Sequence, residues 1–111
     1  MKIVEHSSEK LISERSATTT IEWTVNNNEV HNSEGFKVNA GGTVRVLIGI
    51  NPNDKTVTVG IKKADGTISF VKGKDFISHT FSISKTGTYQ LFVKNDSGKK
   101  VKVSGTYIYS N

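Results

Sequence analysis

From residue 18 onward, apolar side chains recur at every second position, the spacing of a strand with one buried face. The clearest segment is residues 43–50, where Leu47 falls on the opposite face from the valines and isoleucines. No window has the 3.6-residue period of an amphipathic helix. The inward set predicted in this way comprises Ile21, Trp23, Val25, Val44, Val46, Ile48, Ile50, Val57, Val59, Ile61, Ile77, Phe81, Ile83, Tyr89, Leu91, Val93, Val101, Val103, Tyr107 and Tyr109.

Runs of Asn, Asp, Gly and Pro separate these segments and predict turns, as in residues 26–29, 51–54 and 95–98. The pair Asp65-Gly66 is the sharpest of these signals and predicts a hairpin with a type I′ turn. This punctuation predicts about eight or nine short strands. Because each has one apolar face, we expect an all-β, antiparallel two-sheet β-sandwich, jelly-roll or immunoglobulin-like, with no helices.

The chain has 111 residues, which fits one domain. Residues 1–17 are polar and weakly periodic, so we expect an N-terminal arm or an edge strand there, and a single β-sandwich domain over residues 18–111. No apolar run is long enough to cross a membrane, and residues 1–10 contain no apolar segment of a signal peptide. The abundance of Ser, Thr, Asn and Gly favours a secreted or extracellular bacterial domain, of the Gram-positive export type.

The net charge of +5 is unevenly placed. Residues 1–35 carry six Glu against three basic residues, a net of −3, and residues 36–111 carry a net of +8. Such an imbalance is compatible with an anionic polymer, a glycan or a protein surface as partner, and equally with lysines that keep strand edges soluble. Nucleic acid is disfavoured because most aromatic side chains fall on the inward face.

Phe92 is the aromatic exception, since it shares the outward face of its segment with Lys94. If the last two strands pair, Lys94, Lys100 and Lys102 form a basic patch around it. These four residues are therefore the candidate binding site, and the alternative is that Phe92 packs under a loop or a second layer.

Catalytic chemistry has little support. Cysteine is absent and no serine stands in a Gly-x-Ser-x-Gly motif. His6 and His31 fall in polar segments and are expected to be solvated, whereas His79 shares the inward parity and is expected to be a core or sheet-rim histidine. The aspartates sit in turns without the spacing of a calcium loop. We therefore expect no enzyme activity, no metal and no cofactor.

Residues 81–89 (Phe-Ser-Ile-Ser-Lys-Thr-Gly-Thr-Tyr) resemble the turn before the sixth strand of immunoglobulin-like domains, which implies that the hydroxyl of Tyr89 holds a tyrosine corner. Residues 36–46 together with residues 81–93 are similar to the bacterial pre-peptidase C-terminal domain, and this resemblance covers roughly residues 36–109. That family is a secreted β-sandwich appended to exported enzymes and is often linked to substrate or surface binding. Its central Asp-x-Asp-Leu strand is replaced here by residues 56–61, so no ligand site is carried over.

Two functions are compatible with these observations. The first is a small secreted, non-catalytic binding or accessory module for carbohydrate, cell-wall polymer or a protein surface. The alternative is a structural or interaction protein of the adhesin-like, inhibitor or immunity class. A hydrolase that uses His79 with a nearby serine and aspartate is the least favoured hypothesis.

Overall fold

A computed structural model describes residues 1–6, 11–12 and 16–110. Within these residues the chain is all β, with no helix, so the predicted class is confirmed. The strands are β1 (Lys2–Glu5), β2 (Leu11–Ile12), β3 (Ser16–Val25), β4 (Glu29–Asn32), β5 (Phe36–Val38), β6 (Thr43–Asn51), β7 (Val57–Lys63), β8 (Ile68–Gly73), β9 (Phe76–Ser82), β10 (Gly87–Asn95) and β11 (Val101–Ser110).

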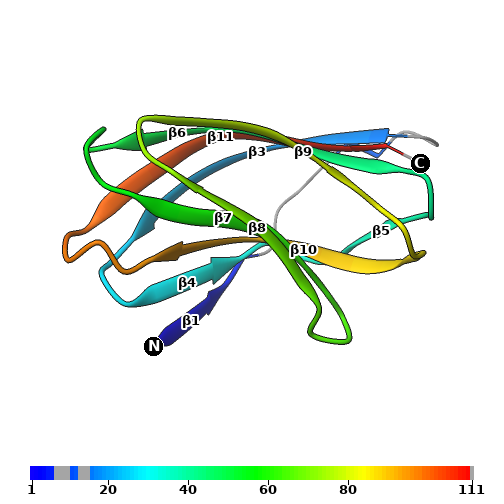
Figure 1. The fold of residues 1–111 in the computed structure, drawn as a ribbon, viewed down its shortest axis with the longest axis horizontal. Coiled ribbons are helices and arrows are strands. Elements are labelled where there is room, and N and C mark those ends of the chain that lie inside the picture. Colours follow the sequence, from blue (N-terminus) through cyan, green and yellow to red (C-terminus); the bar gives the residue numbers. More distant parts are fainter. Residues whose placement is uncertain (7–10, 13–15, 111) are drawn as a thin grey trace.

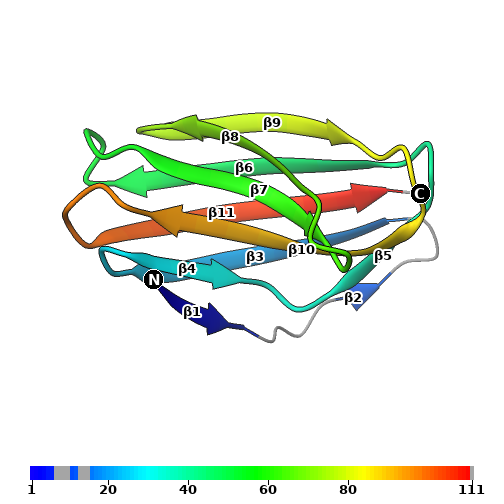
Figure 2. The same cartoon turned by 60° about the horizontal axis from the view of Figure 1, so that its bottom comes forward.

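The strands form two sheets that face each other as the layers of a sandwich (Figure 1). The first sheet has the order β1-β4-β10-β7-β8, with β5 paired to β10, and the second has the order β2-β3-β11-β6-β9. All pairs are antiparallel except β1 with β4, which run parallel at one edge (Figure 2). The short strands β1 and β2 therefore lie at the edges of the two sheets.

The core lies between the sheets and consists of the residues that the alternation places inward. Every residue of the predicted inward set is buried, and Phe36 and Val38 of β5 join them. Tyr107 is fully enclosed, and the ring of Phe36 packs against it and against Tyr109, with centroids 5.3 and 4.6 Å apart. Burial of this apolar surface is the main stabilising contribution to the fold.

Strand β4 differs from the prediction, which places a turn at residues 26–29 and His31 in a polar segment. The turn is shorter, and residues 29–32 pair with both β1 and β10. The inward side chains of this strand are Glu29 and His31, both of them buried. A strand whose buried face is polar has no apolar alternation, and that is why the pattern does not reveal it.

The β7–β8 hairpin lies where Asp65-Gly66 predicts it, but the prediction of a type I′ turn is wrong. Only Gly66 has positive φ (94°), whereas a type I′ turn needs two such residues. The amide of Gly66 donates to the carbonyl of Lys63 at 2.9 Å, and that of Lys63 donates to the carbonyl of Thr67 at 2.8 Å. These bonds define the three-residue loop in which glycine takes the left-handed position.

Candidate functional site

The structure separates the four residues of the predicted basic patch. Phe92 and Lys94 lie on β10, on the outer face of the first sheet. Lys102 lies on β11 in the second sheet, where its ammonium nitrogen is 2.7 Å from the carboxylate of Glu22. Lys100 directly precedes that strand. The single patch is therefore wrong, because the chain crosses between the sheets after Asn95 and the last two strands do not pair.

Phe92 is outward-facing but only 6% exposed, so it offers no aromatic platform of its own. It lies directly opposite Gly60 of β7, which lies opposite Phe70 of β8. A Cβ added at Gly60 would come within 2.8 Å of both the Phe92 ring and the Phe70 Cβ, and would clash with the carbonyl oxygen of Ser69. The missing side chain at residue 60 thus makes the space that the Phe92 ring fills.

Other residues do gather around Phe92. Register places Lys94 in one row with Thr58 and Lys72, and Gln90 in one row with Lys62 and Ile68. Ile68 and Phe70 are each 49% exposed, and β8 is the free edge of its sheet. We call this surface the hairpin face; it comprises Lys62, Ile68, Phe70, Lys72 and Lys94. Its centre is apolar and its surroundings are basic.

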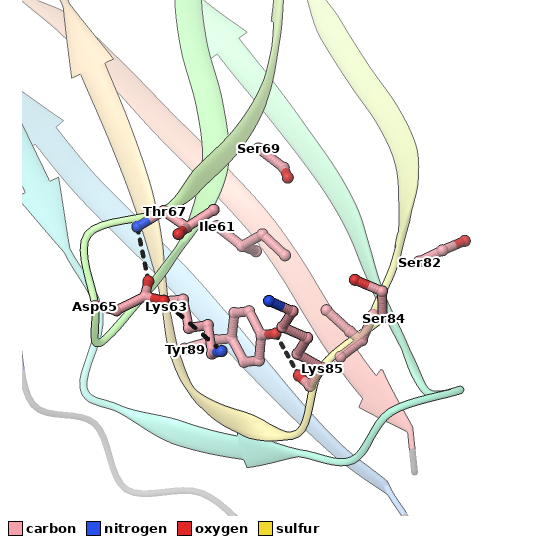
Figure 3. A pocket seen from close by; sticks show the side chains of 10 residues that line it. Ile61, Lys63, Asp65, Thr67, Ser69, Ser82, Ser84, Lys85 and Tyr89 are labelled. Atoms are coloured by element: carbon pink, nitrogen blue, oxygen red, sulfur yellow. Dashed lines mark hydrogen bonds and ion pairs between the residues drawn. The ribbon is translucent and has the colours of Figure 1, made fainter.

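The opposite side of the same hairpin borders a hollow of about 170 Å³, drawn in Figure 3. The hydroxyl of Tyr89 lies in it and donates to the carbonyl oxygen of Lys85 at 2.6 Å, so the tyrosine corner expected for Tyr89 is present. The amide of Thr67 donates to the carboxylate of Asp65 at 2.9 Å, which lowers the pKa of that carboxyl group. Burial and the nearby Asp65 charge raise the pKa of Tyr89.

The side chains that line this hollow can form hydrogen bonds and apolar contacts. Its lining consists of hydroxyl, lysine and apolar side chains, with Asp65 close to the ammonium of Lys63 (3.8 Å). Among the described residues that line the hollow there is no histidine, so the lining itself offers its serines no general base of that residue type. The lining is Ile61, Lys63, Asp65, Thr67, Ser69, Ser82, Ile83, Ser84, Lys85 and Tyr89.

His79 is exposed on the edge strand β9, so the expectation of a buried core histidine is wrong and the sheet-rim alternative is the one observed. Its ring packs edge-on against Phe81, with centroids 4.6 Å apart. The alternation holds along β9, because Ile77 and Phe81 are both buried. His79 lies between them on the same side of this edge strand, but its side chain is exposed to solvent.

The expectation of solvated histidines is also wrong for His31 and His6. His31 is 4% exposed, and His6 is half-buried. The ring nitrogens His6 Nε2 and His31 Nδ1 are 2.7 Å apart, and His31 Nε2 is 3.0 Å from Glu29 Oε1. His6 also stacks on Trp23 at 4.5 Å with an interplanar angle of 9°. Because these residues come from β3, β4 and the end of β1, only the tertiary structure brings them together.

Comparison with known proteins gives a likeness in fold alone. No protein-family model matches the sequence, and no curated protein matches it. The structure is similar to that of PliG from Aeromonas hydrophila, a periplasmic inhibitor of g-type lysozyme, with a TM-score of 0.61 at 14% identity. The likeness covers 98% of this chain and 96% of that one. Across the described ranges, no helix is both long and apolar enough to span a membrane.

Proposed function

We propose that this chain is a non-catalytic, protein-binding module of the inhibitor class, and that its target is a lysozyme. The observation that carries the proposal is the likeness to PliG over almost the whole length of both chains. It favours the inhibitor alternative over the accessory-module hypothesis. An inhibitor needs a rigid scaffold and an exposed contact surface, and it needs no catalytic group.

The hairpin face supports a protein partner. Interfaces commonly combine an apolar or aromatic centre with a polar rim. Ile68 and Phe70 supply such a centre, and Lys62 and Lys72 supply the rim. The hairpin also projects from the body of the sandwich (Figure 1), which allows it to enter a concave partner. Glycosidases carry their catalytic carboxylates in a cleft. The positive charges of the lysines on the hairpin face complement those negative charges.

The test is an inhibition assay with purified g-type lysozyme. The enzyme is mixed with increasing amounts of this protein, and the clearing of a peptidoglycan suspension is followed by turbidity. We expect the rate of clearing to fall to zero as the protein reaches molar excess, and calorimetry to give a defined stoichiometry. A lysozyme of another class serves as the specificity control. Unchanged clearing together with no binding heat would refute the lysozyme target.

The accessory-module hypothesis, with an anionic cell-wall polymer or a glycan as ligand, remains a second proposal. It is supported by the lysines gathered on one face, Lys62, Lys72 and Lys94. Binding to isolated cell walls that is lost at high salt and after reversal of these three charges is the expected result. Binding that survives the charge reversal would exclude this hypothesis.

Both functions place the protein outside the cytoplasm, and we propose an extracellular or periplasmic location. A periplasmic protein with the same fold supports it. The Gram-positive type of export stays a prediction. The resemblance to the pre-peptidase C-terminal domain likewise stays a prediction.

A further inference from the structure

A chain of polar side chains ties the N-terminal strand β1 to the rest of the sandwich. It runs from Glu29 through His31 to His6, with contacts of 3.0 and 2.7 Å. His6 directly follows β1, and its backbone amide donates to the carbonyl of Asn32 at 2.8 Å. Its ring lies parallel to that of Trp23 on the opposite sheet. His6 therefore contacts both sheets at the end of β1, in addition to the backbone pairing of β1 with β4 and the hydrogen bonds that Glu5 accepts from Asn32 and Gln90.

The contacts fix where the protons lie when both imidazoles are neutral. The Glu29 carboxylate is an acceptor, so His31 must carry its proton on Nε2, and its Nδ1 is then an acceptor. His6 Nε2 must therefore be the donor at the 2.7 Å contact. Glu29 is held in its charged form by this bond and by the amide of Asn26, which together lower its pKa to about 2.

The His6–His31 contact tolerates one extra proton but not two. With a single positive charge, one ring donates and the other accepts, so the hydrogen bond persists. With two charges, both facing nitrogens carry hydrogens and the two cations repel each other across 2.7 Å. The contact is therefore lost when both rings carry a positive charge.

We propose that His6 and His31 form an acid-sensitive latch, which holds β1 on the edge of the first sheet at neutral pH and releases it when both rings are protonated. Release leaves the outer edge of β4 unpaired over residues 29–32, where β1 pairs in the latched state. An unpaired strand edge is a template for another strand. The latch thus controls access to one edge of the sandwich.

The charges around the latch fix the direction of the pH effect. Burial and the neighbouring His31 lower the pKa of His6 below 6.5, and Glu5 on β1 acts in the opposite sense. Lys62 on β7 faces Glu5, and Lys2 on β1 lies 3.8 Å from Glu29. Docking of β1 disfavours protonation of His6, because it lowers the pKa of that ring. Docking of β1 is therefore fully favourable above the ordinary histidine pKa and weakens as the pH falls below it.

The Glu29 carboxylate titrates in a separate, more acidic window. Its pKa falls from 4.5 to about 2, so its contribution persists until the pH drops below 4.5. Loss of β1 docking that begins as the pH falls below 6.5, while the pH is still above 4.5, is therefore attributable to the histidine pair and not to Glu29.

Amide hydrogen exchange followed by NMR tests the latch in the full chain. Protection factors are compared at about pH 7.5 and about pH 5 after correction for the intrinsic exchange rate. The amide at position 6 should lose protection by up to about tenfold per pH unit, while that of Tyr107 on the central strand β11 keeps it. The fluorescence of Trp23, the only tryptophan, should change over the same range.

Two variants make the result specific. His6→Gln keeps a side-chain donor for His31 but cannot be protonated, so the protection at position 6 and the Trp23 signal should become independent of pH. His79→Gln removes an exposed histidine elsewhere and should behave as the wild type. Constant wild-type protection at position 6, or an equal loss in His6→Gln, would overturn the proposal.

Discussion

Tyr89 and Lys85 are four residues apart in the chain, and the Tyr89 hydroxyl donates a 2.6 Å hydrogen bond to the Lys85 carbonyl oxygen (Figure 3). The bond spans the turn that leads from β9 into β10. It fixes the loop on one side of the hollow beneath the β7–β8 hairpin. The hydrogen bond therefore links a core aromatic residue to the shape of the hollow.

Tyr89→Phe should lower the free energy of unfolding by about 1 kcal/mol, because the Lys85 carbonyl loses its donor while the ring stays buried. Tyr107→Phe is the matched control. Among the described residues, the Tyr107 hydroxyl is one of the buried groups without a hydrogen-bond partner, so its removal should leave stability unchanged or raise it. Urea unfolding of both variants measures the difference. Equal losses in the two variants would contradict the role given to the corner.

Gly105→Ala should destabilise the protein by at least about 2 kcal/mol. A Cβ at residue 105 of β11 would collide with the Leu47 carbonyl and lie 3.0 Å from the Ile48 Cα, which are backbone atoms that cannot move aside easily. Gly49→Ala is the control, since its nearest neighbour is the Ser104 carbonyl oxygen at 3.5 Å. We expect it to change stability by less than about 0.5 kcal/mol in thermal or urea unfolding. A similar loss at both positions would show that crowding at β11 is not the cause.

Glu29→Gln should flatten the dependence of stability on pH in the acid range. In the wild type the bonds from His31 and Asn26 lower the pKa of Glu29 from 4.5 to about 2, so stability is lost as the pH falls through that interval. The variant has no carboxyl group at position 29 to titrate. The slope of its unfolding free energy against pH should therefore decrease by up to the amount that corresponds to one bound proton. The measurement is a series of urea unfolding curves between these pH values. A wild-type slope in the variant would contradict the role given to the Glu29 carboxylate.

The double variant Ile68→Thr and Phe70→Thr tests the hairpin face. Both side chains are half-exposed and threonine suits a strand, so unfolding should be little affected. If the face contacts lysozyme, inhibition should weaken by about tenfold or more. Phe76→Thr removes a residue that is 56% exposed on the second sheet and should leave inhibition intact. An unchanged inhibition curve for the double variant would move the contact surface elsewhere.

Much of the fold could be predicted from the chain because alternation is a local property. The even-numbered residues of 44–50 are buried and Leu47 is not, as the two-residue period requires. Tyr89 was likewise predictable, because its bond to Lys85 closes within a few residues. The candidate site was not predictable to the same extent. Phe92 and Lys94 do share an outer face, but the residues beside them come from β7 and β8.

The residue pattern along the chain predicted most of the strands, the face that each of them buries and the position of most turns. Tertiary structure alone decided which strands became neighbours. It put β10 and β11 in different sheets, which separates Lys102 from Phe92, and it put β1 beside β4, which buries His31 against His6. The physical reason is that parity specifies a side chain's face, whereas pairing depends on contacts between segments far apart in the chain. A strand whose buried face is polar, such as β4, can be recognised only from those contacts.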